Sequence, residues 1–282
     1  MIETLGQALQ FTFMRHALLA GLLVSVVCGI IGTFVVVNRI VFISGGIAHA
    51  AYGGIGLGYF LGWNPVLGAI LFSVTSALAM GVVHRRTRER ADTIIGVLWA
   101  IGMAVGIILV DLAPGYKADL MSYLFGSILA VPTSDLWIML VLDVVVVVMV
   151  VLFYKELVAM SFDEVFATVQ NVPVSAIYLL LLCLIAFAVV MMMRVVGLIM
   201  VIALLTIPAA ISAQFVKDMR KMMMLATVLG MVFTTSGLWL SYFLNLTSGA
   251  TIILVAGAAY LASLALRNVL RRSRAVRGDW PL

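Results

Sequence analysis

The chain has 282 residues, of which 65% are hydrophobic and 10% are charged, and its formal net charge is +5. A typical soluble domain has about 45–50% apolar and about 25% charged residues. With a mean hydropathy of +1.23, the chain carries far more apolar side chain than one soluble core of this length can bury. The composition excludes a soluble enzyme, a nucleic-acid-binding module and a disordered chain. It predicts an all-α, polytopic membrane protein.

Nine segments are apolar and long enough to cross a bilayer, which takes a helix of about 20 residues. They cover residues 17–37, 45–61, 65–83, 93–111, 136–153, 174–193, 195–215, 222–243 and 249–266. A further apolar stretch, residues 121–131, is too short to cross and lies between Asp119 and Pro132. We therefore expect one membrane domain over residues 1–282, with eight or nine transmembrane helices and a half-span element.

The distribution of basic residues predicts the orientation, because Lys and Arg concentrate in short cytoplasmic loops. When the basic loop 84–90 is placed in the cytoplasm and nine spans alternate, only Arg15, Lys117 and Arg194 of the 17 basic residues fall outside. The N-terminus is then external, and the basic tail, residues 267–282, is cytoplasmic. A full crossing by residues 121–131 would move most later positive charges outside, so the charge pattern favours a half-span there.

His49 is the one histidine of the sequence that lies well inside a predicted span, within the stretch SGGIAHAAYGGIGLGYFLG. Small residues recur every four positions in this stretch: Ala50, Gly54, Gly58 and Gly62. Such a stripe lets neighbouring helix backbones approach closely. Gly45, His49 and Gly53 form the adjacent row, so His49 is expected to point into the bundle. An ionisable group there is a functional candidate; the alternative is a histidine that hydrogen-bonds a neighbouring helix.

Two other predicted spans contain a residue that is unusual in a membrane helix. Asp143 begins the apolar run LDVVVVVMVVL, and a carboxylate at that depth faces a cavity or a partner. The alternative is that Asp143 lies close to the outer membrane interface. Pro208, in LLTIPAAISAQF, removes a backbone hydrogen bond and predicts either a static kink or a gating hinge.

Sulfur-containing residues carry no predicted metal site. The methionine triplets 191–193 and 222–224 indicate packing or lipid-facing side chains, because three consecutive residues point around a helix and do not converge on one ion. Cys28 and Cys183 have neither the spacing nor the setting of a disulfide framework or a zinc site. Both are interpreted as small core residues.

The cytoplasmic loop MSFDEVFATVQNVPV predicts a short amphipathic helix over residues 162–171. Its apolar residues recur at helical spacing: Phe162, Val165, Phe166 and Val169. Asp163 and Glu164 stand in the first turn, where the helix dipole favours acidic groups. Such a helix suits docking on a soluble partner. The alternative, a helix lying on the lipid interface, is disfavoured by its acidic start and its lack of Lys and Arg.

Motifs for catalysis are missing from the sequence. There is no G-x-x-x-x-G-K-[ST] loop to bind ATP phosphates, no H-E-x-x-H and no G-x-S-x-G. The chain is therefore predicted not to be an enzyme. A secondary transporter remains an alternative, although such proteins usually need intramembrane acids and Asp143 is the only candidate.

Five segments, in order along the chain, resemble the permease subunit of bacterial and archaeal ABC importers for zinc, manganese or iron. They are NRIVFISGGIAHAAYGGIGLGYFLG, ADTIIGVLWAIGMAVGI, DLMSYLFGSILAV, the loop from Phe162, and VGLIMVIALLTIPAA. The third resembles the family's half-span with its L-F-G core, and the loop from Phe162 resembles the coupling helix that sits on the ATPase.

The resemblance implies a homodimer in the cell (inner) membrane, with two ATPase subunits below and an extracytoplasmic metal-binding protein above. ATP would bind only to the ATPase subunit, and its hydrolysis would switch the pathway between outward- and inward-facing states. A coupling helix containing Phe162, Asp163, Glu164 and Phe166 would transmit this change. No covalently bound cofactor is implied. His49 would contact the transported divalent metal ion, and further pathway candidates are Ser44, Gly45, Tyr123, Ser127 and Asp143.

The sequence departs from the family pattern at two positions. Gly45 stands where the family commonly has an Asp four residues before the His, and Ser127 stands where an Asp often follows L-F-G. The pathway is therefore less charged, and selectivity is expected to rest mainly on the binding protein. Zinc is the first expected ion and manganese or iron the next. The alternative is a related ABC permease for a siderophore or another metal chelate, which typically has a longer chain.

Overall fold

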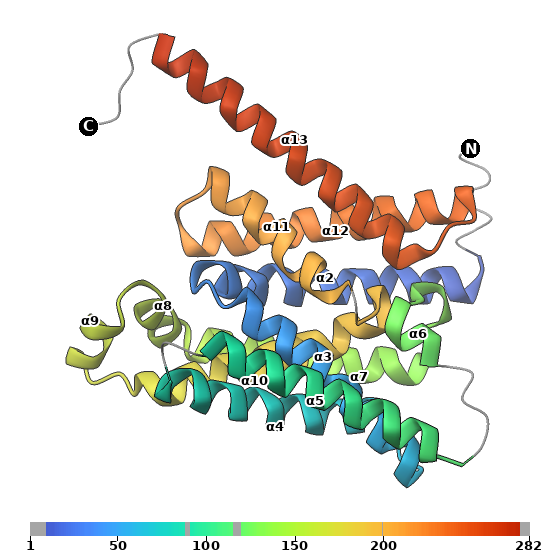
Figure 1. The fold of residues 1–282 in the computed structure, drawn as a ribbon. Helices are drawn as coiled ribbons and strands as arrows, with labels where there is room; N and C mark the ends of the chain where they lie inside the picture. Colours follow the sequence, from blue (N-terminus) through green and yellow to red (C-terminus); the bar gives the residue numbers. More distant parts are fainter. Residues whose placement is uncertain (1–9, 88–90, 115–119, 199, 277–282) are drawn as a thin grey trace.

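The computed structural model describes residues 10–87, 91–114, 120–198 and 200–276 (Figure 1). These residues form helices and no strand, which confirms the predicted fold class. Eight of the described helices are long and apolar enough to cross a membrane. They are α2 (Thr12–Val37), α3 (Val41–Leu61), α4 (Pro65–Arg86), α5 (Ala91–Leu112), α7 (Thr133–Leu152), α10 (Val174–Val196), α12 (Met219–Leu244) and α13 (Ser248–Val276).

The seventh predicted span, residues 195–215, is shorter than expected. Val195 and Val196 complete α10, the chain breaks at Gly197, and α11 covers only Val201–Phe215. Its 15 residues span about 22 Å, less than the roughly 30 Å hydrocarbon core. Even so, α10 runs away from the α8–α9 end of the bundle and α12 starts back at that end (Figure 1). The short α11 therefore makes the return passage.

The predicted half-span is confirmed as a non-crossing element. It consists of α6 (Leu120–Phe125) and a 3-10 turn, η1 (Ile128–Ala130). In Figure 1 α6 lies at the end of the bundle opposite to α8 (Tyr154–Phe162) and α9 (Glu164–Val169).

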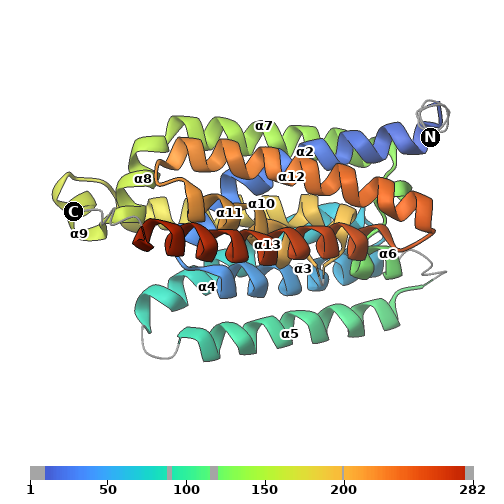
Figure 2. The ribbon, with the colours of Figure 1, turned by 90° about the horizontal axis from the view of Figure 1, so that it is seen from above.

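Helix α3 lies in the interior and packs on both α4 and α5. The predicted close approach of backbones along its small-residue stripe is confirmed, because a Cβ on Gly54 would strike the carbonyl of Gly68 in α4. On the neighbouring row, a Cβ on Gly53 would lie 2.8 Å from the carbonyl oxygen of Gly102 in α5. Figure 2 shows α5 and α7 at opposite edges of the bundle.

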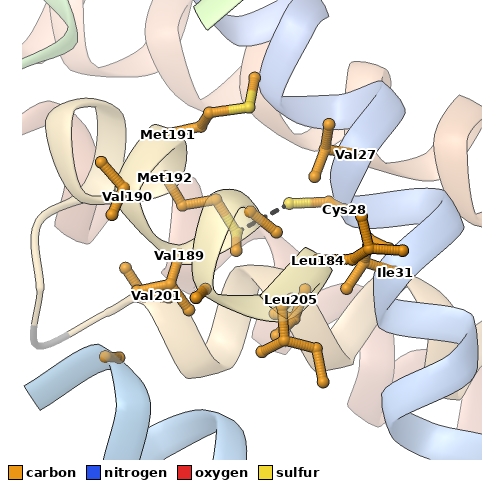
Figure 3. Close-up of a cluster of buried hydrophobic side chains, with 14 of the residues drawn as sticks. Val27, Cys28, Ile31, Leu184, Val189, Val190, Met191, Met192, Val201 and Leu205 are labelled. Carbon is orange, nitrogen blue, oxygen red and sulfur yellow. Dashed lines mark hydrogen bonds between the residues drawn. The ribbon is translucent and has the colours of Figure 1, made fainter. Parts of the chain in front are cut away.

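Sulfur-containing side chains pack in the core between α2 and α10 (Figure 3). Cys28 donates a hydrogen bond to the sulfur of Met192 at 3.0 Å, and the whole 191–193 triplet is buried. Of the second triplet, Met222 and Met223 are buried and Met224 is exposed. Both cysteines are free thiols. The interpretation as core packing groups is confirmed for Cys28 and the buried methionines, whereas Cys183 is only partly buried.

The last helix is longer than the predicted span 249–266. Because α13 continues to Val276, much of the predicted basic tail is helical, and residues 277–282 lie outside the described residues. Arg88, Arg90 and Lys117, which entered the charge argument, also lie outside them.

Candidate metal pathway and coupling surface

His49 lies on the side of α3 that faces α5. Its half-buried ring stacks on the indole of Trp99, with ring centroids 4.2 Å apart and an interplanar angle of 13°. Its Nδ1 atom is buried and has no hydrogen-bond partner. The alternative of a histidine tied by Nδ1 to a neighbouring helix is therefore not what the structure shows. This nitrogen is a free polar atom inside an apolar bundle.

Three helices meet beside this histidine. Gly45 lies one turn earlier on α3, and a Cβ there would come within 2.7 Å of Cδ1 of Ile202 in α11 and 4.0 Å of the Trp99 ring. The neighbouring Ser44 is buried and donates its hydroxyl hydrogen bond to the carbonyl of Val41 at 2.8 Å. Gly45 therefore lies beside His49 on a surface shared by α3, α5 and α11, whereas the one hydrogen bond of the Ser44 side chain stays within α3.

Tyr123 and Ser127 lie at a different depth. The amide of Ser127 donates to the carbonyl of Arg194 at 3.4 Å, and the Arg194 guanidinium sits 4.5 Å from the centroid of the buried Tyr123 ring. Both contacts are at the end of α10 beside α6. His49 belongs to the first half of α3, which begins at the α8–α9 end (Figure 1). The structure does not bring these residues together with His49.

Asp143 is buried halfway along α7, with only 7% of its surface exposed, and its Oδ1 has no hydrogen-bond partner. Helix α7 packs on α2 and α10. This position disagrees with the alternative of an interfacial Asp143. It also separates Asp143 from His49, which faces the opposite edge of the bundle (Figure 2).

The described residues contain no group of three or more His, Cys, Asp and Glu side chains that could hold a metal ion. A cation beside His49 would have to complete its coordination with other ligands, such as water or groups from a second chain. Within one described chain, the surroundings of His49 do not form a closed metal cage.

The predicted coupling helix is divided in two. Phe162 ends α8, and α9 begins only at Glu164 because the Asp163 carboxylate caps it, accepting a hydrogen bond from the Phe166 amide at 2.9 Å. The helix ends at Val169, two residues earlier than predicted. Asp163 is thus an N-cap residue, and Glu164 occupies the first turn as expected.

An apolar patch covers this segment. Its four members, hereafter the α9 patch, are Phe162, Val165, Phe166 and Val169, which are 66%, 75%, 56% and 73% exposed. Four large apolar side chains exposed together, one at the end of α8 and three on α9, mark a surface for a partner.

Pro208 lies inside α11, and the helix continues through it. The Ser212 hydroxyl donates to the Pro208 carbonyl at 2.8 Å, which stabilises the following turn.

Sequence reasoning missed a polar cluster at the end of α10. Arg194, counted as an exception to the charge rule, forms a largely buried ion pair with Asp135 of α7, at 2.5 Å between Nε and Oδ2. The exception has a physical reason, because the positive charge is neutralised inside the protein. A signal was present in the sequence: Arg194 and Asp135 both flank apolar spans on the same predicted side.

The fold and the site together define a class of protein. A bundle of apolar helices long enough to cross a membrane, with an exposed apolar patch at one end, defines a polytopic membrane protein.

The family model of the ABC 3 transport family matches residues 10–267, and the chain belongs to this family. It is 61% identical over 268 residues to an uncharacterized membrane protein of Synechocystis sp., and the aligned region covers 95% of each chain. It is 36% identical over 248 residues to the manganese transport system membrane protein MntC of Listeria monocytogenes, with 88% of each chain covered. PsaBC from Streptococcus pneumoniae, solved in complex with Fab, is similar in structure, with a TM-score of 0.85, 31% identity and coverage of 93% and 95%.

These findings confirm the family resemblance of the sequence motifs. The chain is a multi-pass membrane protein and the permease component of a metal ABC transporter. It is not an enzyme, because ATP hydrolysis belongs to a separate subunit in this family.

Proposed function

We propose that this chain is the permease of an ATP-driven importer for a divalent metal ion, and that the ion passes His49. The observation that carries the proposal is the buried, unpartnered Nδ1 of His49, held by the Trp99 stack within the bundle. A neutral imidazole nitrogen binds first-row divalent metals. Gly45 provides no carboxylate beside it, which favours a transient contact over a tight site.

The working unit is a homodimer. One chain offers a single histidine at this point, and its described residues form no cluster of three or more His, Cys, Asp and Glu ligands. A second copy would supply a second His49 and complete the coordination of an ion between the two. Tyr123 and Ser127, at the α6 end, are proposed to line the external mouth, and Asp143 remains a pathway candidate on the α2 side.

The α9 patch is the proposed docking surface for the ATPase subunit. It combines exposed apolar side chains with the acidic groups of Asp163 and Glu164, so it fits an apolar groove with a basic rim. The α8–α9 end of the bundle is then cytoplasmic, and the α6 end faces the extracytoplasmic metal-binding protein in a bacterial or archaeal inner membrane.

Manganese and zinc are the two candidate ions. The name of the Listeria relative specifies manganese, which favours testing that ion first. Zinc is favoured by the imidazole ligand and by the lack of a carboxylate at Gly45, because manganese prefers carboxylate oxygens.

Reconstituted transport separates these possibilities. The permease, its ATPase and its metal-binding protein are placed in vesicles, and the uptake of Mn²⁺, Zn²⁺, Fe²⁺ and a ferric siderophore is measured with and without ATP. We expect ATP-dependent uptake of a free divalent ion. Uptake of the siderophore alone would show a chelate permease, and uptake driven by an ion gradient without ATP would show a secondary transporter.

A further inference from the structure

Four side chains from three helices meet where α9 joins the bundle. His84 and Arg85 belong to the last turn of α4, Glu164 is the first residue of α9, and Tyr178 lies in the second turn of α10. Together they line a pocket of about 320 Å³. None of them belongs to the His49 surface, and only Glu164 borders the α9 patch. We refer to these four residues as the α4–α9–α10 junction.

Arg85 contacts the other two helices at once. Its guanidinium carbon lies 5.5 Å from the centroid of the Tyr178 ring, and its Nη2 atom lies 4.0 Å from Oε2 of Glu164. The ring of His84 stacks on the same tyrosine, 5.9 Å between centroids and 21° between planes. Tyr178 is only 5% exposed. Its buried ring therefore fixes the position of the Arg85 guanidinium, which extends to Glu164 of α9.

Helix α9 makes few other contacts with the rest of the bundle. Its one buried residue is Ala167, and the remaining residues of its six are exposed. Its backbone packs on α8 and α10. The ion pair of Arg85 and Glu164 therefore links α9 directly to α4, and the pocket beside this pair leaves room for α9 to move.

Helix α4 leads from this junction to the helix that carries His49. Gly68, near the start of α4, is in backbone contact with Gly54 of α3, about 25 Å along the helix axis from Arg85. A displacement of α9 that pulls on Arg85 would be carried along this helix into the α3–α4 contact.

We infer that Arg85, oriented by Tyr178, is a positioning residue that links the docking helix α9 to α4 through Glu164, and thereby links ATPase movements to the pathway at His49. This inference rests on the proposed function, since it assigns a connection inside the same transport cycle. The ion pair is partly exposed, with 28% and 50% of the two side chains accessible. Such pairs contribute little to stability, so charge reversals at these positions leave the permease folded.

The test is a charge-swap series in the reconstituted complex. Arg85→Glu and Glu164→Arg are each expected to lower the number of metal ions transported per ATP hydrolysed by about fivefold or more, while the ATPase still co-purifies. The double swap, which restores opposite charges, returns the ratio to within about twofold of wild type. Arg86→Glu, the same change one residue further on an exposed side chain, is the matched control and leaves the ratio unchanged.

Three results would overturn the inference: wild-type ratios in both single variants, a double swap that stays uncoupled, or loss of ATPase co-purification in the single variants. The variant Phe166→Asp distinguishes a failure of the inference about Arg85 from a failure of the proposed function. If Phe166→Asp uncouples transport and the junction variants do not, the α9 patch couples without the junction. If Phe166→Asp also behaves as wild type, α9 is not the coupling element at all.

Discussion

Gly126 and Gly197 touch backbone to backbone where the half-span meets the end of α10. Both have a left-handed φ, +73° and +83°, and a Cβ on either residue would strike the backbone nitrogen of the other. A hydrogen bond from the Leu198 amide to the Tyr123 carbonyl, at 2.9 Å, lies beside this contact. The pair of glycines therefore fixes α6 against the break between α10 and α11.

The first prediction is that Gly126→Ala destabilises the permease. The left-handed conformation costs a residue with a Cβ about 1–2 kcal/mol, and the clash with Gly197 adds to this. Thermal unfolding of the detergent-solubilised protein measures the loss. Gly257→Ala is the matched control, because a Cβ there meets nothing within 4 Å and alanine is the better helix former. Equal melting temperatures for Gly126→Ala and wild type would contradict the contact.

The second prediction concerns the ion pair of Arg194 and Asp135, whose side chains are 11% and 6% exposed. Arg194→Ala leaves a buried carboxylate without its partner, which typically costs about 3–5 kcal/mol, and also removes the cation from the Tyr123 ring. We expect a lower melting temperature and poor recovery from the membrane. Arg15→Ala, at an exposed position of α2, serves as the control. An Arg194→Ala variant as stable as Arg15→Ala would show that the pair contributes nothing.

The third prediction is that Phe166→Asp uncouples ATP hydrolysis from transport. A charge in the middle of the α9 patch would have to be desolvated on docking, which is costly without a partner charge. We expect normal membrane insertion and a lower number of metal ions transported per ATP hydrolysed. Gln170→Asp places the same charge on an exposed residue outside the patch and should couple normally. Normal transport by Phe166→Asp would exclude this patch as the docking surface.

The fourth prediction fixes the orientation in the membrane. In a variant without Cys28 and Cys183, a cysteine at Thr247 should react with an impermeant thiol reagent from outside the cell. A cysteine at Lys217 should react only after the membrane is opened. Both positions are exposed and lie at opposite ends of α12. Ser248 is unsuitable for labelling because it is buried. External labelling at Lys217 would reverse the orientation derived from the basic residues.

Much of the architecture was predictable because the membrane imposes a simple length rule. Eight long apolar runs became eight long helices, and the short run between Asp119 and Pro132 became a half-span. The seventh pass was mispredicted because hydropathy continues unbroken from Val195 to Phe215, while the chain itself breaks at Gly197. A helix break that depends on the φ angle of one glycine cannot be detected from the hydropathy of the sequence.

The site was predictable only in part. The position of His49 among small residues correctly placed it in the helical interior, since glycines permit close helix packing. Its stack on Trp99 and the junction around Arg85 depend on residues far apart in the sequence. Helical periodicity predicted the α9 patch, but not the break at Asp163, where capping competes with continuation of the helix.

Transport by His49→Ala tests the central claim most directly. The initial rate of ATP-dependent uptake of the divalent ion is measured in reconstituted vesicles at neutral and mildly acidic external pH, with His16→Ala as the control. A cation binds the neutral imidazole and competes with a proton for it, so falling pH slows the wild-type protein. We predict that His49→Ala is about tenfold slower at neutral pH, as the loss of a contact of about 1.4 kcal/mol implies, and nearly independent of pH. Uptake by His49→Ala equal to wild type at both pH values would contradict a metal pathway past His49.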